Sequence, residues 1–415
     1  MDAVDEVDVA IVGAGGGGLN LLVELDRIAA RAGATPPTVA LIDPVTRAGP
    51  DRTWCFWDAG RSDLDPAVTR SWSRVALVDR AGRSRTLDLD PLRYAMIGSG
   101  DFYALAEESA RRVGAVRLSA PALAVTDGPD LATVTTDAGT VRARWVFDSR
   151  PAAPRRPPRT AWLQHFRGWT VRFADPVLDP DQAVLMDFSV PPAHQSRPGR
   201  SQAEPGVTFG YVLPTSADRA LVEYTVFSRR RLPDGDYDAG LHAYLAARWP
   251  GVDPATVTVE AVEDGAIPMT DASHARRIGH RVFRLGTAGG ATRGSTGYTF
   301  AAMQRQARAV AEVLVTGRGD AVPVPPPAYP ARHRWMDAVL LRALDGGLID
   351  GPDLFVRMFE RNPAERVLRF LDAGTSPRED LAVMFSAPMP AMTRAAAQDA
   401  VARLRGRITS PPRSA

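Results

Sequence analysis

A glycine-rich turn near the N-terminus is the feature that most constrains the fold of this chain. Residues 7–33 read as a short apolar strand, a turn with Gly13, Gly15 and Gly18 in G-x-G-x-x-G spacing, and an amphipathic helix. A second apolar strand follows and ends at Asp43. In such a β-α-β unit the glycines permit the tight turn, the approach of backbone to a pyrophosphate, and close helix–strand packing. The pattern predicts a dinucleotide site at the helix N-terminus, with Asp43 accepting a hydrogen bond from the adenosine ribose.

The layout after this unit favours FAD over NAD. A nicotinamide domain would continue with alternating strands and helices, whereas the segment "DRTWCFWD" (51–58) and a hairpin pattern at 75–90 interrupt the alternation early here. A second hairpin pattern lies at 131–151. The chain then returns to the first sheet near 145 and again near 282, where a strand runs into a second glycine-rich turn. A proline-rich crossing at 151–159 leads into a region of mostly strands. This interleaving is typical of FAD proteins with the hydroxylase-like architecture.

We therefore predict a mixed α/β fold with three parts. They are a Rossmann-like FAD-binding domain (1–74, 91–155 and 275–325), an interleaved antiparallel-sheet substrate domain (75–90 and 156–274), and a C-terminal helical region (326–415). Helices are predicted at 101–114, 301–317, 332–345, 352–372, 377–386 and 390–405, and a polar loop at 191–206.

Composition excludes several functional classes. The chain of 415 residues has a formal net charge of +2, which implies no nucleic-acid partner. Its basic residues are all Arg, which fits either anion and headgroup contacts or a GC-rich coding bias. The single cysteine, Cys55, excludes an intrachain disulfide and a zinc cluster of cysteines, and fits a reducing compartment. The six histidines form no metal-ligand spacing, so we expect no metal.

Hydropathy gives no sign of export or of a membrane span. The N-terminus is acidic and lacks the apolar core of a signal peptide. No stretch approaches the roughly 20 apolar residues of a spanning helix. We expect a cytoplasmic protein that is soluble or lies on a membrane surface. The oligomeric state is not readable from the sequence.

Glu223 is the most unusual polar residue in the strand-rich region. It stands in "GYVLPTSADRALVEYTVF" (210–227), next to Leu221, Val222 and Tyr224. Burial disfavours the charged form of a carboxyl group, so an acid in such surroundings keeps its proton at neutral pH. The alternative is an acid on the solvent face of the strand, paired with an arginine.

Several motifs together resemble the bacterial lycopene cyclase family, flavoproteins that close carotenoid rings. The motifs are the N-terminal "VAIVGAGGGGLNLL", "DRTWCFW" (51–57), "PLRYAMI" (91–97), "VLMDFSV" (184–190), "FGYVLPTSADRALVEYTVF" (209–227), "AIPMTD" (266–271), "FRLGTAGGATRGSTGYTF" (283–300) and "RVLRFLD" (366–372). The resemblance spans about residues 7 to 390. Flavin hydroxylases usually carry Gly-Asp where this chain has Gly286-Thr287, which favours the cyclases.

The resemblance implies a reaction without net redox change. Lycopene or a related linear carotenoid is closed at one or both ends into β-rings, on an enzyme that needs reduced FAD, with NAD(P)H as ultimate reductant. The essential Phe-Leu-Glu-Glu-Thr stretch of the plant members falls on "LVEYT", with Glu223 at the first Glu and Tyr224 replacing the second. Glu223 is thus the expected acid, which protonates the terminal double bond.

Other residues are candidates for the cofactor and the polyene. Gly286, Gly289 and Gly290, with a helix starting near Thr299, are expected to approach the flavin, and Arg52 its phosphate or ribose region, unless it is a surface arginine. Trp54, Phe56, Trp57 and Trp169 either line a polyene tunnel or pack in the core. Arg93 and Tyr94 are candidates to face the isoalloxazine, and Asp271 either orients this region or caps a turn.

Two questions stay open at this stage. The Arg-bearing C-terminal helices suit either a cap on the substrate domain or an anchor on a membrane surface, where lycopene must be met. The activity has alternatives in a FAD-dependent monooxygenase on a hydrophobic substrate and in a carotenoid-binding flavoprotein without turnover. Oxygen use separates the first from a cyclase, and an unchanged pigment spectrum identifies the second.

Overall fold

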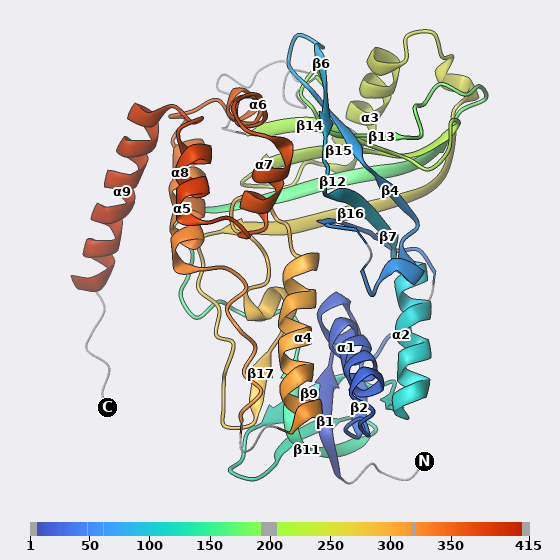
Figure 1. Ribbon diagram of the computed structural model, residues 1–415, viewed down its shortest axis with the longest axis vertical. Coiled ribbons are helices and arrows are strands. Elements are labelled where there is room, and N and C mark those ends of the chain that lie inside the picture. The colour runs from blue at the N-terminus through green and yellow to red at the C-terminus, as the bar shows by residue number, and fades with distance from the viewer. Residues whose placement is uncertain (1–5, 48, 61, 192–205, 318–320, 409–415) are drawn as a thin grey trace.

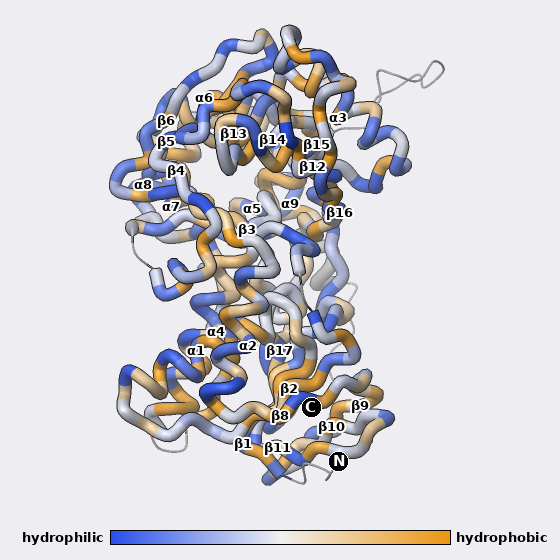
Figure 2. The backbone as a smooth tube through the Cα atoms, turned by 90° about the vertical axis from the view of Figure 1, so that its right-hand side faces the viewer, coloured by the Kyte–Doolittle hydropathy of each residue, from blue (hydrophilic) through white to orange (hydrophobic). Residues whose placement is uncertain are grey.

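Two large sheets lie at opposite ends of the long axis of the molecule (Figure 1), and the view turned by 90° shows the same separation (Figure 2). The computed structural model describes residues 6–47, 49–60, 62–191, 206–317 and 321–408. The predicted mixed α/β fold is confirmed. The predicted loop at 191–206 lies, for residues 192–205, outside the described residues.

The first sheet contains the predicted β-α-β unit. Its seven strands run in the order β8-β2-β1-β11-β10-β9, with β17 also paired to β11. β1, β2, β8, β11 and β17 are parallel, and β9 and β10 form an antiparallel extension. α1 packs against α2 and α4 (Figure 1). The bounds are β1 Glu6–Val12, α1 Gly16–Ala32, β2 Val39–Ile42, α2 Ser99–Val113, β8 Val116–Leu118, β9 Ala122–Thr126, β10 Ala132–Thr136, β11 Gly139–Asp148, β17 Val282–Arg284 and α4 Phe300–Thr316.

The second sheet is antiparallel apart from one strand pair. Its order is β16-β12-β15-β14-β13-β5-β6, and β13 and β5 are parallel. The bounds are β5 Arg74–Val78, β6 Ser84–Asp88, β12 Ala161–Arg172, β13 Gln182–Asp187, β14 Val207–Pro214, β15 Arg219–Ser228 and β16 Thr258–Thr270. α3 (Asp234–Arg248), which the sequence analysis did not predict, packs against β15 and β12.

A small third sheet joins the two large ones. It consists of β3 (Thr53–Asp58), β7 (Arg93–Gly98) and β4 (Arg70–Trp72), in the order β3-β7-β4. Side chains alternate between the two faces of a strand. Tyr94 and Met96 of β7 accordingly join the core under the second sheet, whereas Ala95 and Ile97 join the core around α1 and α2.

The C-terminal helices cover one side of the second sheet (Figure 1). They are α5 Ala331–Asp345, α6 Gly351–Arg361, α7 Ala364–Leu371, α8 Pro377–Met384 and α9 Met389–Ile408. The single helix predicted over 352–372 is wrong, because Asn362 takes an extended conformation before Pro363 and separates α6 from α7. α6 and α7 contribute buried side chains to the core under the second sheet.

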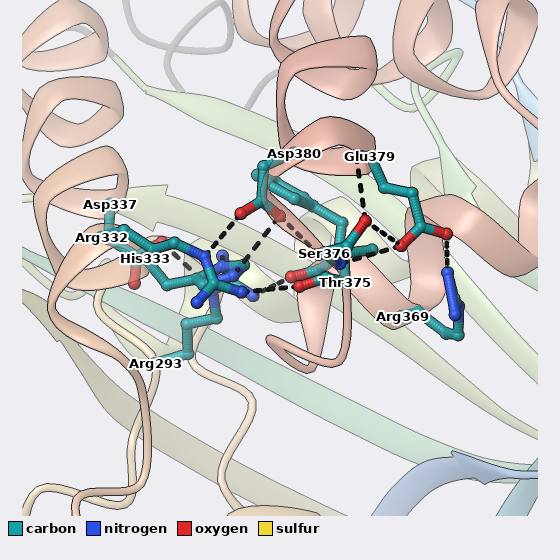
Figure 3. A network of polar contacts seen from close by, with 10 residues as sticks. Arg293, Arg332, His333, Asp337, Arg369, Thr375, Ser376, Glu379 and Asp380 are labelled. Atoms are coloured by element: carbon teal, nitrogen blue, oxygen red, sulfur yellow. Dashed lines mark hydrogen bonds and ion pairs between the residues drawn. The ribbon is translucent and has the colours of Figure 1, made fainter.

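A buried polar network fastens these helices to the segment before α4 (Figure 3). The fully buried Arg293 donates to Asp337 of α5 at 3.1 Å, and its guanidinium also bonds the Phe370 carbonyl. Arg332 of α5 donates to Asp380 of α8 at 2.7 Å. Because a buried charge is stable only when it is paired and hydrogen-bonded, this network fixes one position of the helical region over the sheet.

Candidate active site

One large cavity runs between the first and the second sheet. Its volume is about 990 Å³. Its wall begins at the glycine turn before α1, continues past β3, β14 and β15, and reaches α6 and α7. Pockets of this size hold sizeable organic ligands and occur preferentially between domains.

At the glycine turn, the cavity wall consists of backbone without side chains. Gly13, Gly15 and Gly16 line the cavity, and the N-terminus of α1 has no side-chain cap. A Cβ on Gly15 would meet no atom within 4 Å, whereas a Cβ on Gly18 would lie 2.0 Å from the Gly13 carbonyl oxygen. Gly15 therefore leaves space for a ligand, and Gly18 is required for helix–strand contact. Free N–H groups at a helix N-terminus are suited to phosphate.

Asp43 lies where the β-α-β unit predicts it. It follows β2 and lines the cavity, and its carboxylate accepts hydrogen bonds from the Ala14 and Val45 N–H groups at 2.7 and 2.8 Å. These bonds tie Asp43 to the glycine turn. An oxygen that accepts one hydrogen bond retains a second lone pair for a hydroxyl donor.

Three residues of the cavity wall carry buried polar atoms without a hydrogen-bond partner among the described residues. They are Arg47 Nε, Thr296 Oγ1 and His274 Nδ1. Unsatisfied buried polar atoms are rare in folded proteins and need a partner. Together with the bare glycine turn, they fit a polar ligand such as a flavin dinucleotide in this part of the cavity.

The second glycine turn contributes less than the sequence analysis predicts. Gly286 lines the cavity with a φ of 62°, and Thr299 lines it directly before α4. Gly289 and Gly290 do not line it. A Cβ on Gly289 would lie 2.5 Å from the Arg284 carbonyl oxygen, and Gly290 ends the turn in the left-handed region with a φ of 80°. Local packing and turn geometry account for these two glycines.

The other candidates divide between the cavity and the core. Arg52 lines the cavity while it pairs with Asp51 at 2.9 Å. Trp54 also lines it and stacks on Phe300 at 5.3 Å between ring centroids. Tyr94 lines it, and its hydroxyl lies 2.6 Å from that of Tyr211.

For several candidates that the sequence left open, the structure favours a structural role over a place in the cavity wall. Phe56 and Trp57 pack in the cores on either side of the third sheet, and Trp169 packs on His242 under α3. Arg93 is bound by Asp58 and Asp65 instead of facing the cavity. Asp271 accepts bonds from Arg159, and so fixes the crossing between the sheets.

Glu223 lies in the cavity wall, in the middle of the second sheet. It is 7% exposed, and Thr225 donates to its carboxyl group at 3.3 Å. Glu223 forms no ion pair with another residue in the described part of the chain. The strand register places Tyr211 on one side of it and Gly168 on the other.

A second carboxyl group, Glu263, lies beyond Gly168, and the sequence analysis did not identify it. Gly168 pairs with Glu223 on one side and with Glu263 of β16 on the other. A Cβ on Gly168 would lie 3.0 Å from Cγ of Glu223 and 3.2 Å from Cγ of Glu263. The missing side chain lets the two carboxyl groups meet and hydrogen-bond across β12. Thr53 donates to Glu263 at 2.9 Å.

Burial favours the protonated forms of the carboxyl, thiol and phenol groups in this site. Desolvation, followed by the neighbouring Glu263 charge, raises the pKa of Glu223 well above its usual value. Desolvation also raises the pKa of Glu263, against the hydrogen bonds from Thr53 and Glu223. Burial raises the pKa of Cys55 to about 12, and burial also raises the pKa of Tyr211 well above its usual value. At neutral pH the neighbours of Glu223 are therefore a thiol and phenols that keep their protons.

The remainder of the wall is hydrocarbon. It comes from β13, β14, β15, α6 and α7, and its side chains are Leu185, Met186, Phe209, Phe227, Phe355, Met358, Phe359 and Leu371. Because α6 and α7 form part of this wall, these helices of the C-terminal region cover the hydrocarbon part of the cavity, which fits the first of the two alternatives from the sequence. The described chain contains no helix whose length and apolar character would let it traverse a bilayer.

Comparison with solved structures shows the fold. The chain is similar to p-nitrophenol 4-monooxygenase PnpA from Pseudomonas putida DLL-E4 (TM-score 0.59, 14% identity, 95% of this chain and 98% of that one). It is also similar to the flavin-dependent brominase Bmp2 (0.53, 14%, 89% and 94%) and to the anhydrotetracycline hydroxylase OxyS from Streptomyces rimosus (0.52, 17%, 89% and 76%). These relatives carry the architecture of FAD-dependent, hydroxylase-like flavoproteins.

Sequence comparison shows the family. No curated protein sequence matches this chain. The model of the family described as "Lycopene cyclase protein" matches residues 8–397, which include the glycine turn, Glu223 and the helices that close the cavity. The chain therefore belongs to the lycopene cyclase family.

Proposed function

We propose that this protein is a lycopene β-cyclase, which closes the ψ end groups of lycopene into β-rings without net redox change. One observation carries the proposal: a buried carboxyl group, Glu223, whose pKa burial raises well above its usual value, lies in the wall of a hydrocarbon-lined cavity, and this cavity also reaches a glycine turn of the dinucleotide-binding type. The product has the same atoms as the substrate, so the reaction is an isomerisation that forms γ-carotene or β-carotene.

The chain's own residues account for the proton step. Glu223 protonates the terminal double bond, the neighbouring double bond attacks the cation, and loss of a ring proton gives the β-ring. Phe209 and Phe227 in the wall exclude water, which would quench the cation. Their ring faces add an attraction of roughly 0.5–2 kcal/mol each when desolvated.

The cofactor in this proposal is FAD. Gly13, Gly15 and Gly16 at the start of α1 would hold the pyrophosphate, and Asp43 the adenosine ribose. Arg47 and Arg52 line the same region with positive charge. When bound in its reduced form, with NAD(P)H as ultimate reductant, FAD would supply negative charge that stabilises the cation.

The direct test is Glu223→Gln, incubated without oxygen with lycopene, FAD and NADPH. We expect a fall in ring formation of about 10²-fold or more, because this is the usual contribution of a general acid. Bound flavin, measured by its absorbance, should be retained. Glu260→Gln is the matched control, because Glu260 lies on β16 of the same sheet but pairs with Arg172 and Arg219 at the surface.

Two outcomes would overturn the proposal. If Glu223→Gln forms rings at the wild-type rate, Glu223 is not the acid. Stoichiometric consumption of oxygen and NADPH by the wild type, with a product heavier by one oxygen atom, would identify a monooxygenase. A cyclised product has the mass of lycopene and a shorter chromophore.

We also propose that the enzyme works on the cytoplasmic surface of a membrane, because lycopene is insoluble in water. Three apolar side chains at the end of α8 and the start of α9 support this placement. Leu381, Phe385 and Met389 follow one another at intervals of four residues and are 51%, 62% and 38% exposed. Exposed apolar side chains on helices that also carry arginines, such as Arg378 and Arg394, suit an interface with lipid.

A further inference from the structure

Glu263 is a second titratable group at the candidate acid, and the proton step described above does not use it. It belongs to β16, the edge strand of the second sheet, and is half-buried. Glu223, by contrast, lies two strands in and is almost fully buried. The hydrogen bond between the two carboxyl groups therefore joins the interior of the cavity to the edge of the sheet.

Gly168 provides the space for the contact between the two carboxyl groups. Gly168 is the residue of β12 that faces both carboxyl groups, and any Cβ there would approach both of them to about contact distance or closer. Glycine weakens a strand interior, so its presence here has a packing reason. The pair also has a fixed orientation, because Thr53 donates to Glu263 and Thr225 donates to Glu223.

Two carboxyl groups in contact cannot both ionise freely, and a single shared proton relieves the repulsion. We propose that Glu263 is a positioning residue of the acid step: it forms with Glu223 a pair that shares one proton, and its negative charge keeps that proton on Glu223 at neutral pH. This inference rests on the proposed function. The O–H bond of Glu223 breaks as the alkene C–H bond forms, and the ring C–H bond that breaks later returns a proton to the pair. The pair thus carries one proton before and after each turnover, and no co-reactant is needed.

The groups around the Glu223–Glu263 pair keep one protonation state near neutral pH. The pair itself is therefore the group that titrates there. Hydrogen bonds from Arg52, Tyr103 and Ser99 hold the pKa of Asp51 at about 2 against its partial burial, so Asp51 and Arg52 are fixed charges near neutral pH. Cys55, Tyr94 and Tyr211, from β3, β7 and β14, keep their protons there.

The test is Glu263→Gln, with Asp264→Asn as matched control. Asp264 is the next residue on β16, points to the other face and pairs with Arg167. With the Glu263 charge removed, we expect the alkaline limb of the kcat profile for ring formation to move to lower pH by about one unit. KM for lycopene should stay within about twofold, and Asp264→Asn should behave as wild type.

A second measurement does not depend on turnover. Infrared difference spectroscopy of the FAD-loaded, oxidised enzyme reports the C=O stretch of a protonated carboxyl group, and Glu223→Gln identifies the band of Glu223. In Glu263→Gln this band should disappear at a lower pH than in the wild type. Glu263→Asp retains the charge farther away and should give a smaller shift in the same direction, which tests the idea even if Glu263→Gln fails to fold.

Equal midpoints in wild type and Glu263→Gln, by either measurement, would overturn the inference. This failure is distinguishable from failure of the proposed function. If the wild type forms no rings from lycopene, the cyclase proposal falls, while the infrared titration still decides whether the two carboxyl groups share a proton.

Discussion

At the scale of single residues, Glu223 lies where an ionised carboxylate is poorly solvated. It is nearly buried in a strand whose neighbours are also buried, and its hydrogen-bond partners are the Thr225 hydroxyl and the Glu263 carboxyl group. In the proposed function, the burial that preserves the proton for chemistry also makes ionisation of Glu223 unfavourable in the folded state. Function and stability are therefore opposed at this position.

This opposition predicts a pH-dependent gain in stability for Glu223→Gln. The raised folded pKa means that the folded wild type binds more protons than the unfolded chain above the unfolded value of about 4.5, so its stability falls as pH rises from there toward the folded pKa. Gln has no such loss. We expect the variant to exceed the wild type by about 1–3 kcal/mol at pH 7 and to match it near pH 4, measured by urea unfolding.

The control in this experiment is the comparison at pH 4, where the variant and the wild type should be equally stable. A stability difference between variant and wild type that is the same at pH 4 and at pH 7 would show that the pKa of Glu223 is not raised in the folded state. Such a result would count against the acid as well as against the stability argument.

The two carboxyl groups differ in how far the sequence could identify them. Glu223 stands out because its immediate neighbours in the chain are apolar. Glu263 follows Ala261 and Val262 in a strand with polar and charged residues on both faces, so nothing local distinguishes it. Only the register of β15, β12 and β16 brings Glu263 beside Glu223 through Gly168, and such pairing of distant segments is not encoded in a local pattern.

At the scale of elements, the N-terminus of α1 combines two glycines with different physical roles. Gly18 packs against β1, where a Cβ would lie 2.9 Å from the Ile11 side chain and still closer to the Gly13 carbonyl oxygen. Gly15 faces open space in the cavity wall. The helix therefore separates a packing requirement from a binding requirement within one turn.

The separation predicts different results for two alanine substitutions. Gly18→Ala should destabilise the fold by about 2 kcal/mol or more, because the new methyl group overpacks the strand–helix contact. Gly15→Ala should leave the melting temperature of the flavin-free protein unchanged and weaken FAD binding about tenfold or more, measured by fluorescence titration. Equal FAD affinity in Gly15→Ala and wild type would argue against a pyrophosphate at this turn.

Elements with a strong local pattern were predicted, and those defined by distant partners were not. The β-α-β unit, the hairpin at 131–151 and the return of 145–148 to the first sheet beside β1 follow from local periodicity. The third sheet was missed because its short strands pair across some 40 residues. α3 could have been found, since Tyr237, Leu241, Tyr244 and Leu245 recur at helical spacing.

At the scale of the whole molecule, the cavity reaches from the first sheet to the C-terminal helices, so three parts of the protein form its wall. The glycine turn belongs to the first sheet, Glu223 belongs to the second, and α6 and α7 complete the hydrocarbon wall. The network of Arg293, Asp337 and Asp380 holds the helical region in place over this wall. The exposed group of Leu381, Phe385 and Met389 lies on the same helical region.

If this group contacts lipid, its removal should separate membrane binding from chemistry. We expect the triple substitution of Leu381, Phe385 and Met389 by Gln to lower recovery with liposomes in a flotation assay by about 100-fold in partition coefficient, from about 1 kcal/mol lost per side chain. Ring formation from lycopene in detergent micelles should remain within about twofold of wild type, since none of the three lines the cavity.

The control makes the same kind of substitution on a surface for which no contact with lipid is proposed. Val116 and Leu123, exposed on strands of the first sheet, are replaced by Gln, and this variant should float like the wild type. Because the apolar surface removed is similar in kind, a loss restricted to the C-terminal variant would locate the contact on α8 and α9. Unchanged flotation of the triple variant would show instead that these helices serve only as the cap of the cavity, and that lycopene reaches Glu223 by another face of the molecule.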